Sequence, residues 1–157
     1  MIELKSGSVK IEMLDDIAPK HVAQIKKIAA AGGYDGILFH RVIDGFMAQT
    51  GDVEHGKATA DGNVPRRAGT GGSTLPDIPA EFSTVPFDRG VVGMARSQSP
   101  DSANSQFFIM FEDGHFLNNN YTVWGRVVDG MSHVDNITRG EPPQNPDQMI
   151  SVKIVSE

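Results

Sequence analysis

The sequence contains no cysteine. This absence excludes disulfide bonds, thiol nucleophiles and metal sites with cysteine ligands. An excess of basic residues is missing as well, since 14 lysines and arginines stand against 20 aspartates and glutamates, giving a formal net charge of -6. Proteins that bind nucleic acids usually carry a basic surface, so we expect no nucleic-acid partner.

Long hydrophobic runs are also missing. Residues 1–14 alternate apolar and polar side chains without an apolar run of signal-peptide length, and no window of the chain approaches the roughly 18 apolar residues of a membrane span. We therefore expect a cytoplasmic protein that does not associate with a membrane. The 157 residues suit a single domain over 1–157, and this size favours a monomer.

Apolar periodicity predicts the first elements. A hairpin is indicated by apolar residues at every second position around Ser6-Gly7-Ser8, namely Ile2, Leu4, Val9, Ile11 and Met13. A helix should follow, with Pro19 near its first turn, Gly32-Gly33 at its end, and one apolar face formed by Val22, Ile25, and Ile28 or Ala29. Later, Met131, Val134, and Asp135 or Ile137 have helical spacing, and Gly140 is expected to close this short second helix.

Residues 53–89 are rich in Gly, Pro, Asp and Thr and have no sustained periodicity, which predicts long ordered loops. Strand patterns return in GVVGMAR (90–96), QFFIMF (106–111), YTVWGRVV (121–128) and ISVKIVS (150–156). Roughly eight short strands with only two helices favour an antiparallel barrel, because parallel strands would need helical crossovers. Closure of the barrel would remove exposed strand edges.

Most conventional catalytic motifs are missing. The chain has no G-x-S-x-G, H-E-x-x-H, P-loop or dinucleotide-binding fingerprint, and GTGGST (69–74) lacks the Gly-Lys-Ser/Thr that follows in a phosphate loop. We expect no cofactor and no metal. Asp52, Glu54 and His55 form a local group of acids and a histidine, so a metal-dependent hydrolase built on these residues is one alternative.

Arg41 lies within an apolar stretch, FHRVIDGFMAQTGD (39–52), which suggests two strands around Asp44-Gly45. An arginine is rarely buried without a partner, because burying its charge removes its hydration and costs on the order of several kcal/mol. Arg41 therefore has either an internal carboxylate partner, such as Asp52 or Glu81, or a role at a groove.

The run 106–111 is a predicted strand whose two faces carry different side chains. Alternation places Phe107, Ile109 and Phe111 on one face of the strand, and Gln106, Phe108 and Met110 on the other. Aromatic runs of this kind usually belong to a core, but both faces cannot point to the same core. The face with Gln106 beside Phe108 is thus a candidate wall of an apolar groove.

Five motifs, in order and at about the expected spacings, resemble the cyclophilin family of peptidyl-prolyl isomerases. They are FHRVIDGFMAQTGD, GTGG, GVVGMAR, NSQFFI and VWGRVVDGM, and the resemblance spans essentially the whole chain. It implies a mainly β fold, a closed eight-stranded antiparallel barrel capped by two α-helices, which agrees with the elements counted above. It also implies an enzyme that isomerises X-Pro bonds and binds proline-containing peptides and unfolded protein chains.

The resemblance further implies an active groove. Its residues would be Arg41, Phe46, Met47, Gln49, Ala95, Gln106, Phe108 and Leu117. Phe116 and Tyr121 stand where eukaryotic members have tryptophan and histidine, as in the bacterial branch. Phenylalanine lacks the indole N–H donor, so any binding of cyclosporin-like ligands should be weak. Thr50 stands where many members of the family have a second glycine, and Arg96 stands where many have asparagine.

Within this groove, Arg41 is expected to be catalytic, stabilising the twisted amide, and Gln49 to orient it or to bind the substrate backbone. A tight two-residue turn at Asp44-Gly45 would place Met47 and Gln49 on the face opposite Arg41. We therefore predict a wider or bulged connection over residues 44–47. The main alternative from another class is a module that binds proline peptides without isomerising them.

Overall fold

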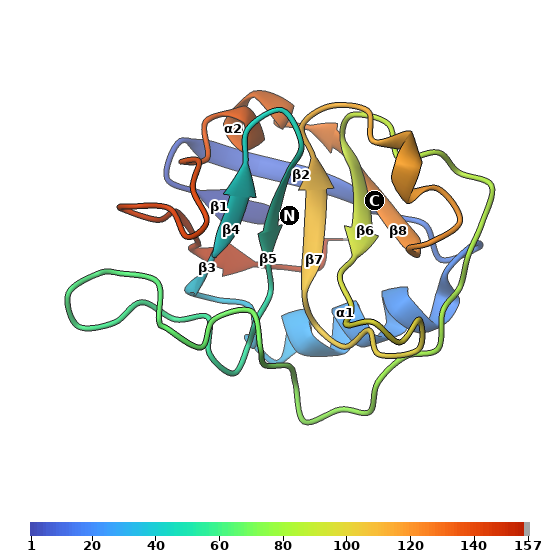
Figure 1. Ribbon diagram of the computed structural model, residues 1–157, viewed down its shortest axis with the longest axis horizontal. Coiled ribbons are helices and arrows are strands. Elements are labelled where there is room, and N and C mark those ends of the chain that lie inside the picture. The colour runs from blue at the N-terminus through green and yellow to red at the C-terminus, as the bar shows by residue number, and fades with distance from the viewer. Residues whose placement is uncertain (156–157) are drawn as a thin grey trace.

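The computed structural model describes residues 1–155, and its main element is one eight-stranded antiparallel sheet (Figure 1). The strand order is β10-β1-β2-β8-β6-β7-β5-β4. The bounds are β1 (Ile2–Leu4), β2 (Gly7–Met13), β4 (Arg41–Ile43), β5 (Met47–Thr50), β6 (Val91–Met94), β7 (Phe107–Met110), β8 (Val123–Asp129) and β10 (Ser151–Val152).

The sheet curls so that β4, β5, β7 and β6 form a front wall, with β1, β2 and β8 behind it (Figure 1). It does not close, because β10 and β4 are its two ends and do not pair. A separate two-stranded sheet, β3 (Ile37–Leu38) with β9 (Gln148–Met149), is continuous in the chain with both of these ends. The expectation of a closed barrel is therefore corrected to a curled, open one.

The first hairpin and the first helix have the predicted patterns. Ile2 pairs with Val9 across the β1–β2 turn. Helix α1 (Pro19–Ala30) begins with Pro19 at its first turn and buries the predicted apolar face. It lies across the lower end of the curled sheet, while α2 (Met131–Asp135) lies near the upper end (Figure 1).

The segment after α2 differs from the prediction in one respect. The helix ends at Asp135, five residues before Gly140, so Gly140 does not close it. Gly140 instead exchanges two backbone hydrogen bonds with Val42, at 2.8 and 2.7 Å, and protects the outer edge of β4. The backbone therefore runs alongside β4 at the point where Arg41 is located.

The connection between β4 and β5 is one residue longer than a two-residue turn. Ile43 pairs with Met47 and Arg41 pairs with Gln49. The Phe46 N–H donates to the carbonyl of Ile43, and Gly45 has a φ of 72°, which a residue with a side chain rarely adopts. The predicted wider connection is confirmed, and it brings Arg41, Met47 and Gln49 to the same face of the hairpin.

Two hydrophobic clusters cover opposite faces of the front wall. Phe107 and Ile109 point into the barrel and pack with α1, α2 and the back strands. Phe108 and Met110 point outward and pack against the 3₁₀ helix η1 (His115–Leu117) and against Phe87. The predicted alternation of β7 is thus confirmed, and the outer cluster supports a groove. Among residues 1–155, no helix is long and apolar enough to cross a bilayer.

Candidate active site

A groove of about 740 Å³ lies on the outer face of the front wall. It brings together eight of the ten residues predicted to form the site, namely Arg41, Phe46, Met47, Gln49, Ala95, Phe108, Leu117 and Tyr121. Gln106 borders an adjoining polar pocket of about 190 Å³ and contacts Gln49. Phe116 does not line the groove and has 71% of its surface exposed.

The apolar part of the groove is formed by side chains that are themselves well packed. Met47, Phe108 and Leu117 are all buried. The ring of Phe108 stacks on Phe87, with 5.7 Å between ring centres, and β6 carries glycine at position 93, where a Cβ would lie only 2.5 Å from Phe87 and 2.6 Å from Phe108. The floor of the groove is therefore held in one arrangement by its neighbours.

Arg41 lies on β4 at one side of this floor, and 45% of its side chain is exposed. Its Nε donates to a carboxylate oxygen of Glu141 at 3.1 Å, and its Nη1 donates to Oε1 of Gln49 at 3.3 Å. The alternative of an internal carboxylate partner named Asp52 and Glu81 as examples, but the carboxylate that pairs with Arg41 is Glu141. Glu141 reaches Arg41 because the Gly140–Val42 bridge fixes the preceding backbone.

A chain of amide groups continues from Arg41 into the neighbouring loop. Nε2 of Gln49 donates to Oε1 of Gln106 at 3.0 Å, and Nε2 of Gln106 donates to the carbonyls of Gly69 and Gly71. Each donor in the chain thus has an acceptor, which fixes the orientation of both glutamines. The network joins Arg41 on β4 to the glycine-rich loop at residues 69–72.

Asp52 anchors that same loop rather than a metal ion. Its carboxylate accepts four backbone N–H groups, from Glu54, His55, Gly69 and Gly71. Burial alone would raise the pKa of Asp52, but these four bonds outweigh burial and hold the pKa below its usual value. Within residues 1–155, Asp52, Glu54 and His55 do not converge as metal ligands, which removes the basis of the hydrolase alternative.

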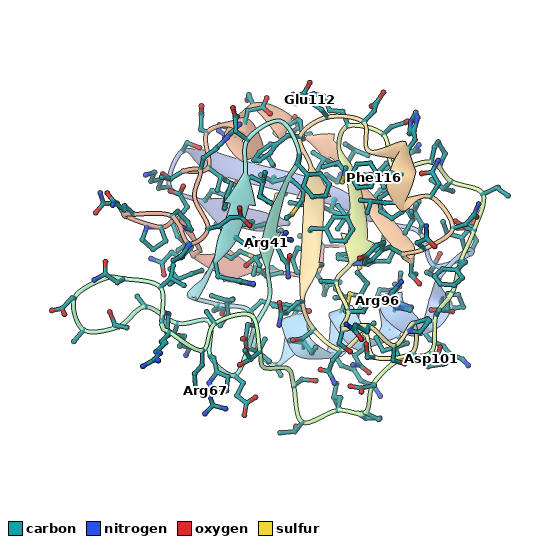
Figure 2. All side chains as sticks on the ribbon, viewed as in Figure 1. Arg41, Arg67, Arg96, Asp101, Glu112 and Phe116 are labelled. Carbon is teal, nitrogen blue, oxygen red and sulfur yellow. The ribbon has the colours of Figure 1, made fainter. Side chains whose placement is uncertain are left out.

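The opposite side of the groove is aromatic and cationic. In Figure 2, Arg41 lies on the β4 side of β7, whereas Phe116 and Arg96 lie on the β6 side. Tyr121 packs edge-on against Phe108, at 5.9 Å between ring centres, and the Arg96 guanidinium lies 4.5 Å from the centre of the Tyr121 ring. Phe116 contacts Phe46 at 5.5 Å and extends the apolar surface beyond the groove.

Several lining residues were not predicted. They are His40, Arg96, Glu141, Pro142 and the loop segments Val64–Arg66 and Ala68–Thr70. His40 is buried, and burial lowers its pKa. Its place beside Arg41 in the motif was a usable signal, but Glu141 is 100 residues from Arg41 in sequence and no local pattern relates them.

Thr50, the other departure noted in the sequence, has an internal role. It is fully buried, and its hydroxyl donates to the carbonyl of Leu38 at 2.9 Å. This bond ties β5 to β3 across the interruption at residues 39–40. Thr50 does not border the groove.

Comparison with known proteins agrees with this geometry. Residues 1–156 match the family described as cyclophilin type peptidyl-prolyl cis-trans isomerase/CLD. A probable peptidyl-prolyl cis-trans isomerase of Brucella suis is 57% identical over all of this chain and 82% of that protein. A peptidyl-prolyl cis-trans isomerase of Acinetobacter baylyi is 36% identical over 99% of this chain and 86% of its own length.

Solved structures show the same fold. A cyclophilin from Hirschia baltica is 31% identical, with a TM-score of 0.80, and the match covers 96% of this chain and 71% of that one. A cyclophilin type isomerase from Cryptosporidium parvum, determined in the presence of the dipeptide Ala-Pro, is 26% identical with a TM-score of 0.84 over 99% and 98% of the two chains. The present chain thus belongs to the cyclophilin-type family and is a peptidyl-prolyl cis-trans isomerase.

Proposed function

We propose that the enzyme acts by non-covalent electrostatic stabilisation of a twisted X-Pro amide, with Arg41 as the catalytic residue. Rotation about this bond breaks amide resonance and has a barrier of about 20 kcal/mol. In the twisted state the prolyl nitrogen regains its lone pair. A fixed cationic donor beside that nitrogen stabilises the transition state more than it stabilises either planar isomer.

The observation that carries this proposal is the way Arg41 is held. Glu141 accepts from Nε and Gln49 accepts from Nη1, so the plane of the guanidinium is set from two sides. Among the described residues, the other N–H groups of Arg41, including those of Nη2, have no acceptor, so they can serve the substrate. Gln49 and Glu141 act through Arg41 and are positioning residues.

The apolar floor has a second role in this mechanism. Met47, Phe108 and Leu117 provide a pocket for the proline ring. A ring bound there displaces water from beside Arg41, and lower local polarity strengthens the charge interaction with the amide. A lowering of the barrier by about 7 kcal/mol corresponds to about five decades in rate.

We propose proline-containing peptides and flexible or unfolded chain segments as the substrates. The open groove accepts an extended segment from outside, and the related Cryptosporidium parvum structure, which was determined with Ala-Pro, supports a proline-containing ligand. Uncatalysed prolyl isomerisation takes tens of seconds, so the enzyme would assist folding where that step is slow.

The central test is cis/trans exchange of a short Ala-Pro-Phe peptide, measured by NMR for wild type, Arg41→Ala and Arg41→Lys. Arg41→Ala should lower kcat/KM by about 10²–10³, the usual effect of removing one donor at a developing charge. Arg41→Lys should retain part of the activity, because a lysine keeps the charge but not the planar fork. Wild-type exchange should survive a chelator and change little between pH 6.5 and 8.

Two results would refute the mechanism. One is an Arg41→Ala variant that folds and exchanges the peptide at the wild-type rate. The other is a wild-type protein that binds the peptide and leaves exchange at its spontaneous rate, in which case the peptide-binding module is the better account. Glu141→Gln adds a finer test, since a positioning residue should lower kcat severalfold with little change in KM.

A further inference from the structure

The charges around the groove differ from those of the whole chain. The protein has a net charge of -6, yet the charged residues that line the groove are three arginines, Arg41, Arg66 and Arg96, and one glutamate, Glu141. Glu141 is paired with Arg41. Within residues 1–155, the arginines that form ion pairs are Arg41, Arg89, Arg126 and Arg139. Neither Arg66 nor Arg96 therefore has a carboxylate oxygen of this range within 4.0 Å.

Arg96 is held in place by neutral groups. Its Nε and Nη2 donate to the carbonyl of Asn120 at 3.1 and 2.6 Å, and its Nη1 donates to the carbonyls of Ser97 and Gln98 at 2.9 and 3.2 Å. The ring of Tyr121 supports the flat face of the guanidinium. These contacts order the side chain, and within the part of the chain that the structure describes they leave its positive charge without a counter-ion and one Nη2 hydrogen available.

The position of Arg96 relates this charge to the residues next to the proline. Arg96 stacks on Tyr121, which itself packs on Phe108, so the guanidinium is two ring contacts from the floor of the groove. It also borders both the main groove and the adjoining polar pocket, together with Gln49, Gly69 and Ala95. Residues of an extended peptide are spaced by about 3.3 Å, so a side chain near the bound proline comes close to Arg96.

We propose that the groove selects proline segments with a carboxylate side chain at one of three positions, namely two residues before the proline, one before it or one after it, and that Arg96 is the specificity-determining residue. Arg66, on the exposed loop at another part of the lining, adds to the positive field. An ordered cation binds a carboxylate with little further loss of side-chain freedom. This inference rests on the proposed binding of the proline ring over Phe108.

The test uses three pairs of alanine-rich peptides with one proline. Each pair has Glu or Gln at one position: two residues before the proline, one residue before it, or one after it. Catalysed exchange is measured by NMR at 20 mM and 500 mM NaCl. For at least one pair, wild type should show a kcat/KM about two- to fivefold higher for Glu, the range of a partly exposed ion pair, and high salt should reduce this ratio.

Matched variants assign the effect to a residue. Arg96→Gln should bring the Glu/Gln ratio to about one, Arg96→Lys should keep part of it, and Arg66→Gln should reduce it in part. Arg67→Gln removes the same charge from the same loop at a residue outside the lining, so its ratio should match wild type. A wild-type ratio near one for all three pairs, or an unchanged ratio in Arg96→Gln, would overturn the proposal.

The ratio separates this proposal from the mechanism at Arg41. Arg41→Ala should slow both members of each pair by about 10²–10³, as for the Ala-Pro-Phe peptide. A failure of charge selection therefore changes only the ratio, whereas a failure of the Arg41 mechanism shows as undiminished exchange of the Gln peptides by Arg41→Ala.

Discussion

The two faces of β7 have similar apolar side chains, but the inner face is packed completely in the core and the outer face borders the groove. Inside the barrel, Phe107 makes edge contacts with Tyr34 at 5.5 Å and with Trp124 at 5.4 Å, and all three rings are buried. Outside, Phe108 also packs on two rings, Phe87 and Tyr121, but one side of it borders the groove.

The difference shows what turns an apolar face into a site. The inner face is covered by α1, α2 and the back strands, so its packing is complete and its residues contribute stability. The outer face is covered only in part, by Phe87, η1 and the loop that ends at Tyr121. The uncovered remainder is bordered by polar groups that hydrogen bonds hold in place and that keep some N–H donors for a ligand, which is the arrangement expected of a binding site.

Phe107→Ala and Phe108→Ala should separate the two faces most strongly. Phe107→Ala opens a closed cavity and should lower the free energy of unfolding by about 3–5 kcal/mol. Phe108→Ala opens toward the groove, so its cost should be nearer the transfer term alone, about 1.5–3 kcal/mol. Urea unfolding measures both.

Activity should show the opposite order. At a temperature where both variants are folded, Phe108→Ala should lower kcat/KM for the Ala-Pro-Phe peptide by about tenfold or more, mainly through KM, because about 1.5 kcal/mol of ring contact or more is lost. Phe107→Ala should change kcat/KM far less. Equal losses of activity in the two variants would contradict a functional division between the faces.

Buried histidines offer a second comparison. His21, on α1, has a pKa lowered by burial, although its hydrogen bond to Glu81 opposes that shift, and His40, at the groove, has a pKa lowered by burial. In both cases the unfolded chain takes up a proton more readily than the folded one. Stability is therefore fully present above about pH 6.5 and is lost as the pH falls toward the folded-state pKa values.

The measurement is the urea midpoint between pH 7.5 and 5. Wild type should lose stability over this window, and His21→Gln and His40→Gln should each flatten the loss. Exposed His115 is the matched control: its hydrogen bond to Asp88 raises its pKa, so it adds stability at low pH that is lost as the pH rises. His115→Gln should steepen the fall of stability toward acid, and a flattened profile there would contradict this assignment.

The sequence predicted the features that depend on neighbours in the chain. The alternation of Phe107 and Phe108 placed them on opposite faces, and the requirement that Arg41 and Gln49 share a face predicted the wider turn. Motif resemblance supplied the groove residues, of which Arg41, Met47, Gln49 and Phe108 lie on the adjacent strands β4, β5 and β7 of the front wall.

Features that depend on distant contacts were missed or wrong. The prediction of a closed barrel was wrong because residues 39–40 separate β3 from β4, and β3 pairs with β9 instead of extending the barrel. No local sequence pattern shows this pairing. Glu141 was missed as the partner of Arg41 because the Gly140–Val42 bridge that brings it there joins segments about 100 residues apart. Gly140 itself looked like a helix stop, although its role is to protect a strand edge.

Phe116→Trp should produce the smallest effect and sharpen the comparison at the edge of the outer face. Phe116 is 71% exposed and its described ring contact is with Phe46, so a larger ring should change the free energy of unfolding by no more than about 0.5 kcal/mol. Tryptophan adds an indole N–H donor and contact area beside the groove. Calorimetric titration with cyclosporin should therefore give a Kd about two- to tenfold lower than that of wild type, the value of one neutral hydrogen bond.

Phe82 provides the control for this last change, because it is also an exposed phenylalanine, at 46%, but among the described residues its ring does not pack on a groove residue, as that of Phe116 does on Phe46. Phe82→Trp should leave the cyclosporin Kd at the wild-type value. If Phe116→Trp also leaves it unchanged, position 116 lies beyond the reach of the ligand and the functional surface ends at Phe46. If both variants tighten binding alike, the gain comes from general surface hydrophobicity, and the outer face has no defined edge at η1.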